Sequence, residues 1–177
     1  MKKFKLLEII YLEIEQTSYF PFKYIPGVIG FFLRYLFVKL MAKKLNGMIW
    51  IPPGVELLHL RNIIFGKNVG INVGTYINGV GSIIFEDFVM VGSNVTINSE
   101  KKIADKMYNQ NNSDSKFPEQ IILKEGCWLA AGTVVFPGVT VGKGSVLGAN
   151  SLASKNIPDF EIYAGAPAKK IRSREIK

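Results

Sequence analysis

A six-residue spacing of apolar positions runs through residues 63–152. An aliphatic or aromatic residue opens each hexad and a small or β-branched residue tends to sit fifth, as in FGKNVG, INVGTY, LAAGTV and VFPGVT. Neither the helical period nor a simple two-residue alternation produces this spacing. A short strand followed by a tight turn does, with Gly or Asn where the turn needs a positive φ. Three such strands close one triangular coil, so we predict an all-β solenoid, a parallel β-helix of hexapeptide repeats, over residues 51–157.

The hexads stop at a polar run, EKKIADKMYNQNNSDSKFPEQ, and resume after it. The interior of a coil has no room for so many polar side chains. We therefore predict a loop inserted at one corner of the solenoid, over about residues 100–121. Long loops on regular scaffolds often carry function, although a tolerated surface insertion would give the same pattern.

Residues 1–50 lack the hexads and are predicted to be a helical segment. The run YIPGVIGFFLRYLFVKL is interrupted by a charge and is shorter than the ~20 residues that span a bilayer. A helix over about residues 30–45 would mix apolar and basic side chains, the basic ones being Arg34, Lys39, Lys43 and Lys44. Two interpretations remain open: the helix lies in a membrane interface, or it packs against the main domain or a subunit partner.

The charge balance favours anionic partners. The chain has 22 Lys and Arg against 14 Asp and Glu, a formal net charge of +8. Basic residues are concentrated in the extension over residues 158–177, in GAPAKKIRSR, where they could receive a phosphorylated ligand; a solvated basic tail is the alternative. No nucleic-acid-binding motif accompanies the charge, so we expect no nucleic acid partner.

One cysteine and one histidine limit the chemistry. Cys127 cannot form an internal disulfide, which indicates a reducing, cytoplasmic compartment, and we interpret it as a small buried apolar residue. His59 precedes the recognised hexads and is interpreted as a partly buried structural residue. One histidine and one cysteine are too few to form a metal site from His and Cys ligands, so we expect no metal.

The hexads resemble those of a known family when taken with the motif GAPAKKIRSR and the preceding stretch EGCWLAAGTVVFPGVTVGKGSVLGANSLASKNIP. Together they resemble the hexapeptide-repeat acyltransferases with a left-handed β-helix, and within them the O-acetyltransferases of sugars, polysaccharide precursors and antibiotics. The resemblance covers residues 63–177. It implies a left-handed helix, acetyl-CoA as the acyl donor, and a homotrimer that holds the donor in a groove between neighbouring subunits.

The resemblance also implies which residues hold acetyl-CoA. Small side chains in successive coils would leave backbone groups open to the pantetheine arm, cations would lie near the phosphates, and an aromatic residue would lie near the thioester. Small-residue packing and solvation are the structural alternatives. The implied residues are Trp128, Ala131, Ala149, Ser154, Lys155, Lys169 and Arg172.

On the acceptor side the resemblance implies sugar contacts for Asn72 and Asn78, although a turn-forming role explains either asparagine equally well. The family carries a catalytic histidine at the start of the inserted loop, and this chain has Glu100 and Lys102 there instead. As a base, Lys102 would need a pKa far below its ordinary ~10.4, and Glu100 would need desolvation. Either residue could instead be a solvated loop charge.

These observations predict an acetyl-CoA-dependent acetyltransferase that acts directly on a hydroxyl, or an amino group, of a saccharide or polysaccharide precursor. The acceptor could be lipid-linked, on the cytoplasmic face of a bacterial membrane. The alternative is a catalytically impaired β-helix homologue that binds CoA or serves in assembly. General base catalysis contributes ~10²–10⁴-fold, whereas positioning supplies ~7–11 kcal/mol, so a member without the family histidine could remain a slow enzyme.

Overall fold

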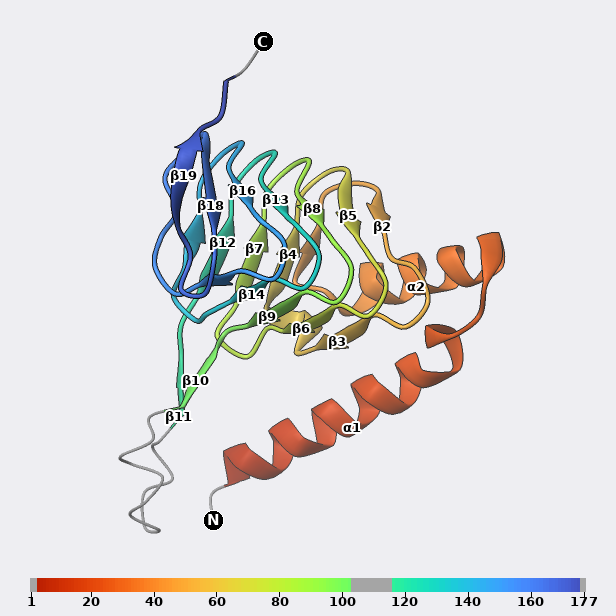
Figure 1. Ribbon diagram of the computed structural model, residues 1–177. Helices are drawn as coiled ribbons and strands as arrows, with labels where there is room; N and C mark the ends of the chain where they lie inside the picture. Colours follow the sequence, from red (N-terminus) through yellow and green to blue (C-terminus); the bar gives the residue numbers. More distant parts are fainter. Residues whose placement is uncertain (1–2, 103–115, 176–177) are drawn as a thin grey trace.

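The chain folds into a parallel β-helix preceded by two helices (Figure 1). The computed structural model describes residues 3–102 and 116–175, with side chains described over 6–100 and 119–175. Three sheets form the sides of the solenoid, and their strands run parallel except for the last strand of one sheet. The all-β solenoid predicted from the hexads is confirmed.

The strands of the three sheets are short, mostly two or three residues. Sheet A contains β1 (Lys44–Leu45), β4 (Ile63–Phe65), β7 (Ile83–Phe85), β12 (Ile121–Leu123) and β15 (Thr140–Val141). Sheet B contains β2 (Ile49–Trp50), β5 (Val69–Ile71), β8 (Met90–Val91), β13 (Trp128–Leu129), β16 (Val146–Leu147), β18 (Glu161–Ala164) and β19 (Lys169–Ser173). Sheet C contains β3 (Glu56–Leu58), β6 (Tyr76–Asn78), β9 (Thr96–Asn98), β14 (Val134–Val135) and β17 (Leu152–Ala153).

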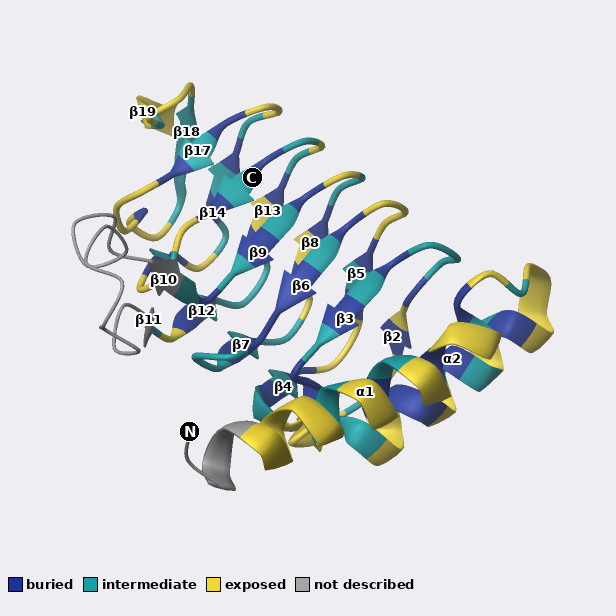
Figure 2. Ribbon diagram, turned by 90° about the horizontal axis from the view of Figure 1, so that it is seen from below, coloured by how far each residue is buried: buried dark blue, intermediate teal, exposed yellow. Residues whose placement is uncertain are grey.

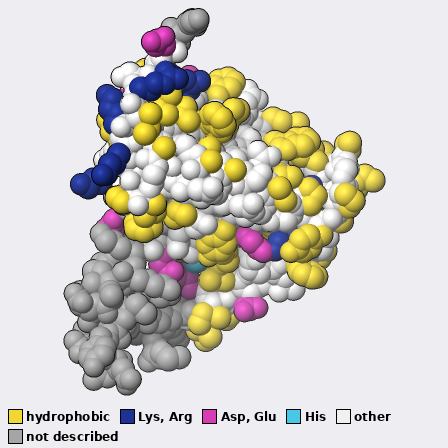
Figure 3. All heavy atoms as spheres, viewed as in Figure 1, with side chains coloured by type: hydrophobic (Ala, Val, Ile, Leu, Met, Phe, Trp, Pro, Cys, Tyr) yellow, Lys and Arg dark blue, Asp and Glu magenta, His cyan; other side chains and the backbone are white. Residues whose placement is uncertain are grey.

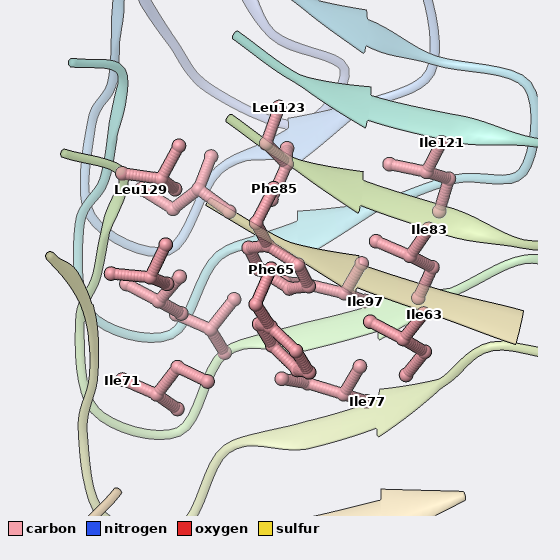
Figure 4. Close-up of a cluster of buried hydrophobic side chains, with 14 of the residues drawn as sticks. Ile63, Phe65, Ile71, Ile77, Ile83, Phe85, Ile97, Ile121, Leu123 and Leu129 are labelled. Atoms are coloured by element: carbon pink, nitrogen blue, oxygen red, sulfur yellow. The ribbon is translucent and has the colours of Figure 1, made fainter. Parts of the chain in front are cut away.

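Buried side chains from all three sheets form one apolar column (Figure 4). The column follows the strand register, because Ile63 pairs with Ile83 and Phe65 with Phe85 across β4 and β7. The rings of Phe65 and Phe85 stack with centroids 5.0 Å apart. Each residue that opens a hexad therefore packs on its equivalent one coil away, which explains the six-residue spacing.

The turns at the corner between sheets B and C have Gly or Asn at a position of positive φ. Gly74, Asn94, Gly132 and Asn150 have φ values of 73°, 56°, 71° and 54°. A Cβ on Gly74 would lie 2.1 Å from Oδ1 of Asn94, so a larger residue does not fit there. The left-handed backbone conformation expected at these turns is confirmed.

Two helices lie against the first coil, α1 (Lys3–Lys23) and α2 (Gly27–Met41), and a short 3₁₀ turn, η1 (Leu60–Asn62), follows β3 (Figures 1 and 2). The strands of the solenoid begin at Lys44, earlier than the boundary at residue 51 taken from the repeat. The helix expected over residues 30–45 begins and ends earlier, and β1 occupies its last expected residues. Among the described residues, no helix combines the length and apolar character needed to cross a bilayer.

The sequence suggested that Arg34 belongs to a basic flank of the helix, but the structure places it elsewhere. Its side chain lies on the buried face of α2 and is 1% exposed. Nε donates to the carbonyl oxygen of Ile51 at 2.9 Å, and Nη1 donates to those of Phe22 and Ile25 at 2.9 and 2.7 Å. The guanidinium thus joins the end of α1, the turn before α2 and the first coil by satisfying backbone acceptors.

Glu15 anchors α1 to the first coil. It is fully buried, and its carboxylate accepts the backbone N–H groups of His59 at 2.8 Å and Leu60 at 2.7 Å. Tyr19 donates from the same helix to the carbonyl oxygen of Val55 at 3.2 Å. The helix is therefore part of the folded unit.

The predicted inserted loop leaves the solenoid at the corner between sheets C and A. Its ends form an antiparallel pair, β10 (Glu100–Lys102) and β11 (Lys116–Pro118), while residues 103–115 lie outside the described part of the chain. At the far end of the solenoid, β18 and β19 form a second antiparallel pair on the edge of sheet B, and the Ala166–Pro167 bond between them is cis. The basic extension thus continues the solenoid as a hairpin.

Candidate active site

A groove of about 480 Å³ lies on the outer face of sheet C, at the base of the inserted hairpin. The lining residues are Thr96, Asn98, Glu100, Val134, Val135, Phe136, Pro137 and Ser154. We refer to it as the sheet C groove. Its only charged lining residue among those described is Glu100.

Strand register explains which side chains face the groove. Ile97 of β9 points into the column and pairs with Val135 of β14, so that their neighbours point outward. Phe136 follows β14 and is 45% exposed on this outer face. Oδ1 of Asn98 accepts the backbone N–H of Glu100 at 3.0 Å, which fixes the path of the chain as it enters the hairpin.

The fold brings two of the predicted site residues together. Glu100, a predicted base, and Ser154, a predicted acetyl-CoA contact, both line the sheet C groove although they are far apart in the sequence. Lys155 follows Ser154 and is exposed. Lys102 lies in β10, but its side chain is outside the described residues.

Ala131 and Ala149 lie at the corner between sheets B and C in successive coils. The backbone N–H of Asn150 donates to the carbonyl oxygen of Ala131 at 2.9 Å, so the two corners stack directly. Both alanines are exposed. The corner therefore has an open surface at both alanines, and the pantetheine path stays a prediction.

The predicted phosphate-binding cations lie at the far end of the solenoid. Lys169 and Arg172 are exposed on β19, where Lys and Arg side chains gather in Figure 3. Neither they nor Lys155 forms an ion pair with another described residue, whereas Lys170 pairs with Glu161.

Trp128 is not brought into the sheet C groove. It lies on the outer face of sheet B and is 44% exposed. Its strand neighbour Met90 is 55% exposed on the same face. Within one chain, the predicted thioester contact and the predicted base therefore lie on different faces.

The two asparagines predicted to contact the sugar occupy different surroundings. Asn72 is exposed at the corner between sheets B and C, and its Nδ2 donates to the carbonyl oxygen of Val91 at 3.2 Å. Asn78 is only 7% exposed, on sheet C, and it pairs in register with Asn98 of the groove. The fold therefore does not bring Asn72 and Asn78 together.

Sequence reasoning missed the pairing of His59 with Asn78. The ring Nδ1 of His59 lies 2.9 Å from Oδ1 of Asn78. Because an amide oxygen only accepts, Nδ1 donates, and Nε2 is then the basic nitrogen of the neutral ring. His59 has φ of 58° and ψ of 43°, a left-handed conformation held by Glu15 through the backbone N–H.

Tyr76 completes this polar cluster on sheet C. Burial raises the pKa of Tyr76, a hydrogen bond with Asn78 lowers it, and the charge of Glu100 raises it further. The cluster of His59, Tyr76, Asn78 and Glu100 could have been found from the coil length, because Ile63 and Ile83 occupy equivalent positions 20 residues apart. That spacing places position 58 beneath 78 and 78 beneath 98.

Cys127 takes no part in the site. It is fully buried in the column, and burial, with a smaller contribution from Glu86, raises the pKa of its thiol to about 12. The interpretation as a small buried apolar residue is confirmed. Among the described residues, no group of three or more His, Cys, Asp or Glu side chains could hold a metal ion.

Sequence comparison relates the chain to acetyltransferases. It is 33% identical over 129 residues to the galactoside O-acetyltransferase of Lactococcus lactis. The aligned region covers 71% of this chain and 61% of that protein. It is 33% identical over 133 residues to WcaF of Escherichia coli K12, provisionally named a colanic acid biosynthesis acetyltransferase, which covers 67% and 73% respectively. The chain spans only 54% of a Schizosaccharomyces pombe protein that is provisionally named an acetyltransferase. No protein-family profile matches the chain.

Solved structures share the fold. A galactoside acetyltransferase in complex with coenzyme A superposes with a TM-score of 0.86 at 25% identity, over 95% of this chain and 82% of that chain. The hexapeptide-repeat acetyltransferase VCA0836 of Vibrio cholerae, complexed with acetyl-CoA, gives 0.79 at 22% identity, over 93% and 89%. Fold and sequence identity thus define a β-helix of the acetyltransferase class. The chain belongs to the hexapeptide-repeat acetyltransferase family.

Proposed function

We propose that the chain transfers an acetyl group from acetyl-CoA to a hydroxyl group, or an amino group, of a saccharide. One observation carries the proposal: Glu100 and Ser154 both line the sheet C groove, at the base of the inserted hairpin. Relatives named as acting on galactosides and in colanic acid biosynthesis support the saccharide class.

For the donor, the open corner at Ala131 and Ala149 supports a path for the pantetheine arm into the groove past Ser154. The exposed cations Lys155, Lys169 and Arg172 would bind the CoA phosphates. Acetyl-CoA here is a substrate, and no metal is required for the transfer.

Trp128 would reach acetyl-CoA from a second copy of the chain. It forms an exposed apolar row on sheet B with Met90, which pairs with it in register and is 55% exposed. Such a row is suited to burial against another subunit. A homotrimer that joins sheet B of one chain to the groove of its neighbour would complete the donor site.

The transfer would be direct, in a complex of both substrates. The acceptor oxygen attacks the thioester carbonyl carbon and loses its proton to a base. The carbon–sulfur bond then breaks, and the thiolate of CoA leaves and takes up a proton. Glu100 in the groove, Lys102 beside it in β10, and His59 held by Asn78 are the candidate bases. A neutral amine acceptor would need less help from a base.

On the acceptor side, Asn78 would orient the sugar or the base, and Asn72 would contact a sugar that extends along the corner between sheets B and C. A lipid-linked saccharide would place the protein at the cytoplasmic face of the membrane. A free saccharide would not require this location.

The test is acetyl-CoA turnover, followed as free thiol, with a panel of sugars and amino sugars. Wild type is compared with Glu100→Gln, Lys102→Ala and His59→Asn. Asn is chosen at position 59 because it tolerates the left-handed backbone. Loss of the base predicts a ~10²–10⁴-fold fall in kcat in one variant, with CoA binding unchanged. CoA binding without turnover on any acceptor would contradict the proposal and would fit a CoA-binding or assembly subunit instead.

A further inference from the structure

The outward face of α2 carries a continuous apolar stripe. Val28, Phe32, Leu36 and Leu40 follow one another at four-residue spacing and are 82%, 59%, 40% and 75% exposed. Figure 3 shows hydrophobic side chains gathered over this part of the molecule. The opposite face of α2, with Phe37 and Val38, is buried, and the described residues leave this stripe exposed. We refer to these four residues as the α2 stripe.

The stretch of chain that contains α2 carries formal charges of one sign. Between Glu15 and Glu56 the sequence contains no Asp or Glu and five Lys or Arg. Lys39, Lys43 and Lys44 are exposed and form no ion pair with another described residue. Glu15 is buried in hydrogen bonds to backbone, and Glu56 pairs with Lys23, so neither carboxylate offsets these lysines.

Beside the stripe lies an apolar depression of about 230 Å³. Val28, Phe31 and Trp50 form part of its wall, and the rings of Phe31 and Trp50 stack with centroids 4.9 Å apart. Trp50 is 57% exposed at this edge of sheet B. Tryptophan beside an aliphatic surface is typical of side chains at the boundary between lipid and water.

We propose that the α2 stripe docks on the surface of an anionic phospholipid bilayer. An apolar face flanked by lysines binds such a surface by burying its side chains among the acyl chains while the ammonium groups remain at the phosphates. A protein partner would need acidic groups opposite these lysines.

The arrangement leaves the rest of the molecule accessible. The α2 stripe lies at the first coil, while β18 and β19 lie at the opposite end of the solenoid (Figure 1). With α2 in the plane of the membrane, the solenoid stands away from the surface. The docking surface does not depend on the acetyl-transfer proposal, since it uses none of the proposed site residues.

Vesicle sedimentation tests the proposal with the full-length protein and without either substrate. The vesicles contain phosphatidylcholine alone or phosphatidylcholine with phosphatidylglycerol. Wild type should sediment with the anionic vesicles. Val28→Glu and Leu40→Glu should each lower the partition coefficient about 10-fold or more, because each removes one buried apolar side chain. Lys39→Gln should lower it about 5-fold on anionic vesicles and not on neutral ones.

Ile171→Glu is the matched control. Ile171 is 62% exposed on β19, at the opposite end of the solenoid, so the same charge change there should leave sedimentation close to wild type. Wild type that stays in solution with anionic vesicles, or an equal loss in Ile171→Glu, would overturn the proposal. So would unchanged vesicle binding by Val28→Glu together with a smaller oligomer in sedimentation velocity, because a second copy would then cover the stripe. Turnover of a soluble acceptor by the Val28→Glu, Leu40→Glu and Lys39→Gln variants should remain unchanged.

Discussion

Replacing Glu15 should destabilise the fold far more than its position on a surface helix suggests. Its two carboxylate oxygens accept the N–H groups of His59 and Leu60 at 2.8 and 2.7 Å, in a fully buried setting. Oε1 also accepts the hydroxyl of Tyr11 at 3.2 Å. These hydrogen bonds hold the backbone of the first coil at the left-handed residue and tie it to α1.

The magnitude follows from the number of bonds lost. In Glu15→Gln one oxygen remains an acceptor, but the NH₂ group faces a backbone N–H. A hydrogen bond to a charged group contributes ~1.5–3 kcal/mol, so the free energy of unfolding should fall by about 2 kcal/mol. In Glu15→Ala both buried donors lose their partner, and the fall should be about 4 kcal/mol. At ~2–4 °C per kcal/mol for a chain of this size, Tm should fall by roughly 4–8 °C and 8–16 °C.

Urea and thermal unfolding at fixed protein concentration measure both variants. Glu13→Gln is the control, since Glu13 lies on the exposed face of the same helix and the charge change is the same. Its stability should match that of wild type. Glu15→Gln with the stability of Glu13→Gln would refute the reasoning, because the carboxylate would then not be needed to hold the two N–H groups.

Three further predictions test other parts of the structure. Gly30→Ala should destabilise the junction of the helices, because a Cβ there would lie 1.8 Å from the carbonyl oxygen of Ile25; circular dichroism melting checks this. Ala149→Leu should raise KM for acetyl-CoA several-fold in the thiol-release assay without a change in Tm, because position 149 is exposed. Cys127 should resist iodoacetamide at pH 8 until urea is added, as mass spectrometry would show. The pKa of its thiol is about 12 in the folded protein, against an ordinary pKa of 9.0 for a thiol in the unfolded chain. The free energy of unfolding should therefore fall as pH rises between these values, and it should fall less in Cys127→Ala.

The apolar column was readable from the sequence because each coil repeats the same inward residues. The first coil was harder to recognise. Ile49 and Ile51 point inward like later hexad residues, but Trp50 between them is exposed and two prolines follow, so the hexad spacing is obscured. Arg34 was misread because a charge on a helix is usually exposed. Its burial depends on carbonyl groups supplied by three separate segments, which no local pattern contains.

Within the site, sequence motifs indicated residues but not their neighbours. Glu100 and Ser154 meet in one groove only because β9, β14 and β17 are stacked in register. Phe136, the second residue of the hexad VFPGVT, faces outward into that groove, and the repeat alone does not indicate what lies opposite it. The contact of His59 with Asn78 depends on the length of a whole coil, which exceeds the six-residue period used to recognise the repeat.

The most direct test of the central claim is a crystal structure of the protein with CoA bound. We expect the thiol end of CoA in the sheet C groove beside Phe136 and Glu100, the pantetheine arm along the corner at Ala131 and Ala149, and the phosphates near Lys169 and Arg172. A second chain should contribute Trp128. CoA bound on any other face, with the sheet C groove empty, would contradict the assignment of this groove as the acetyl-transfer site.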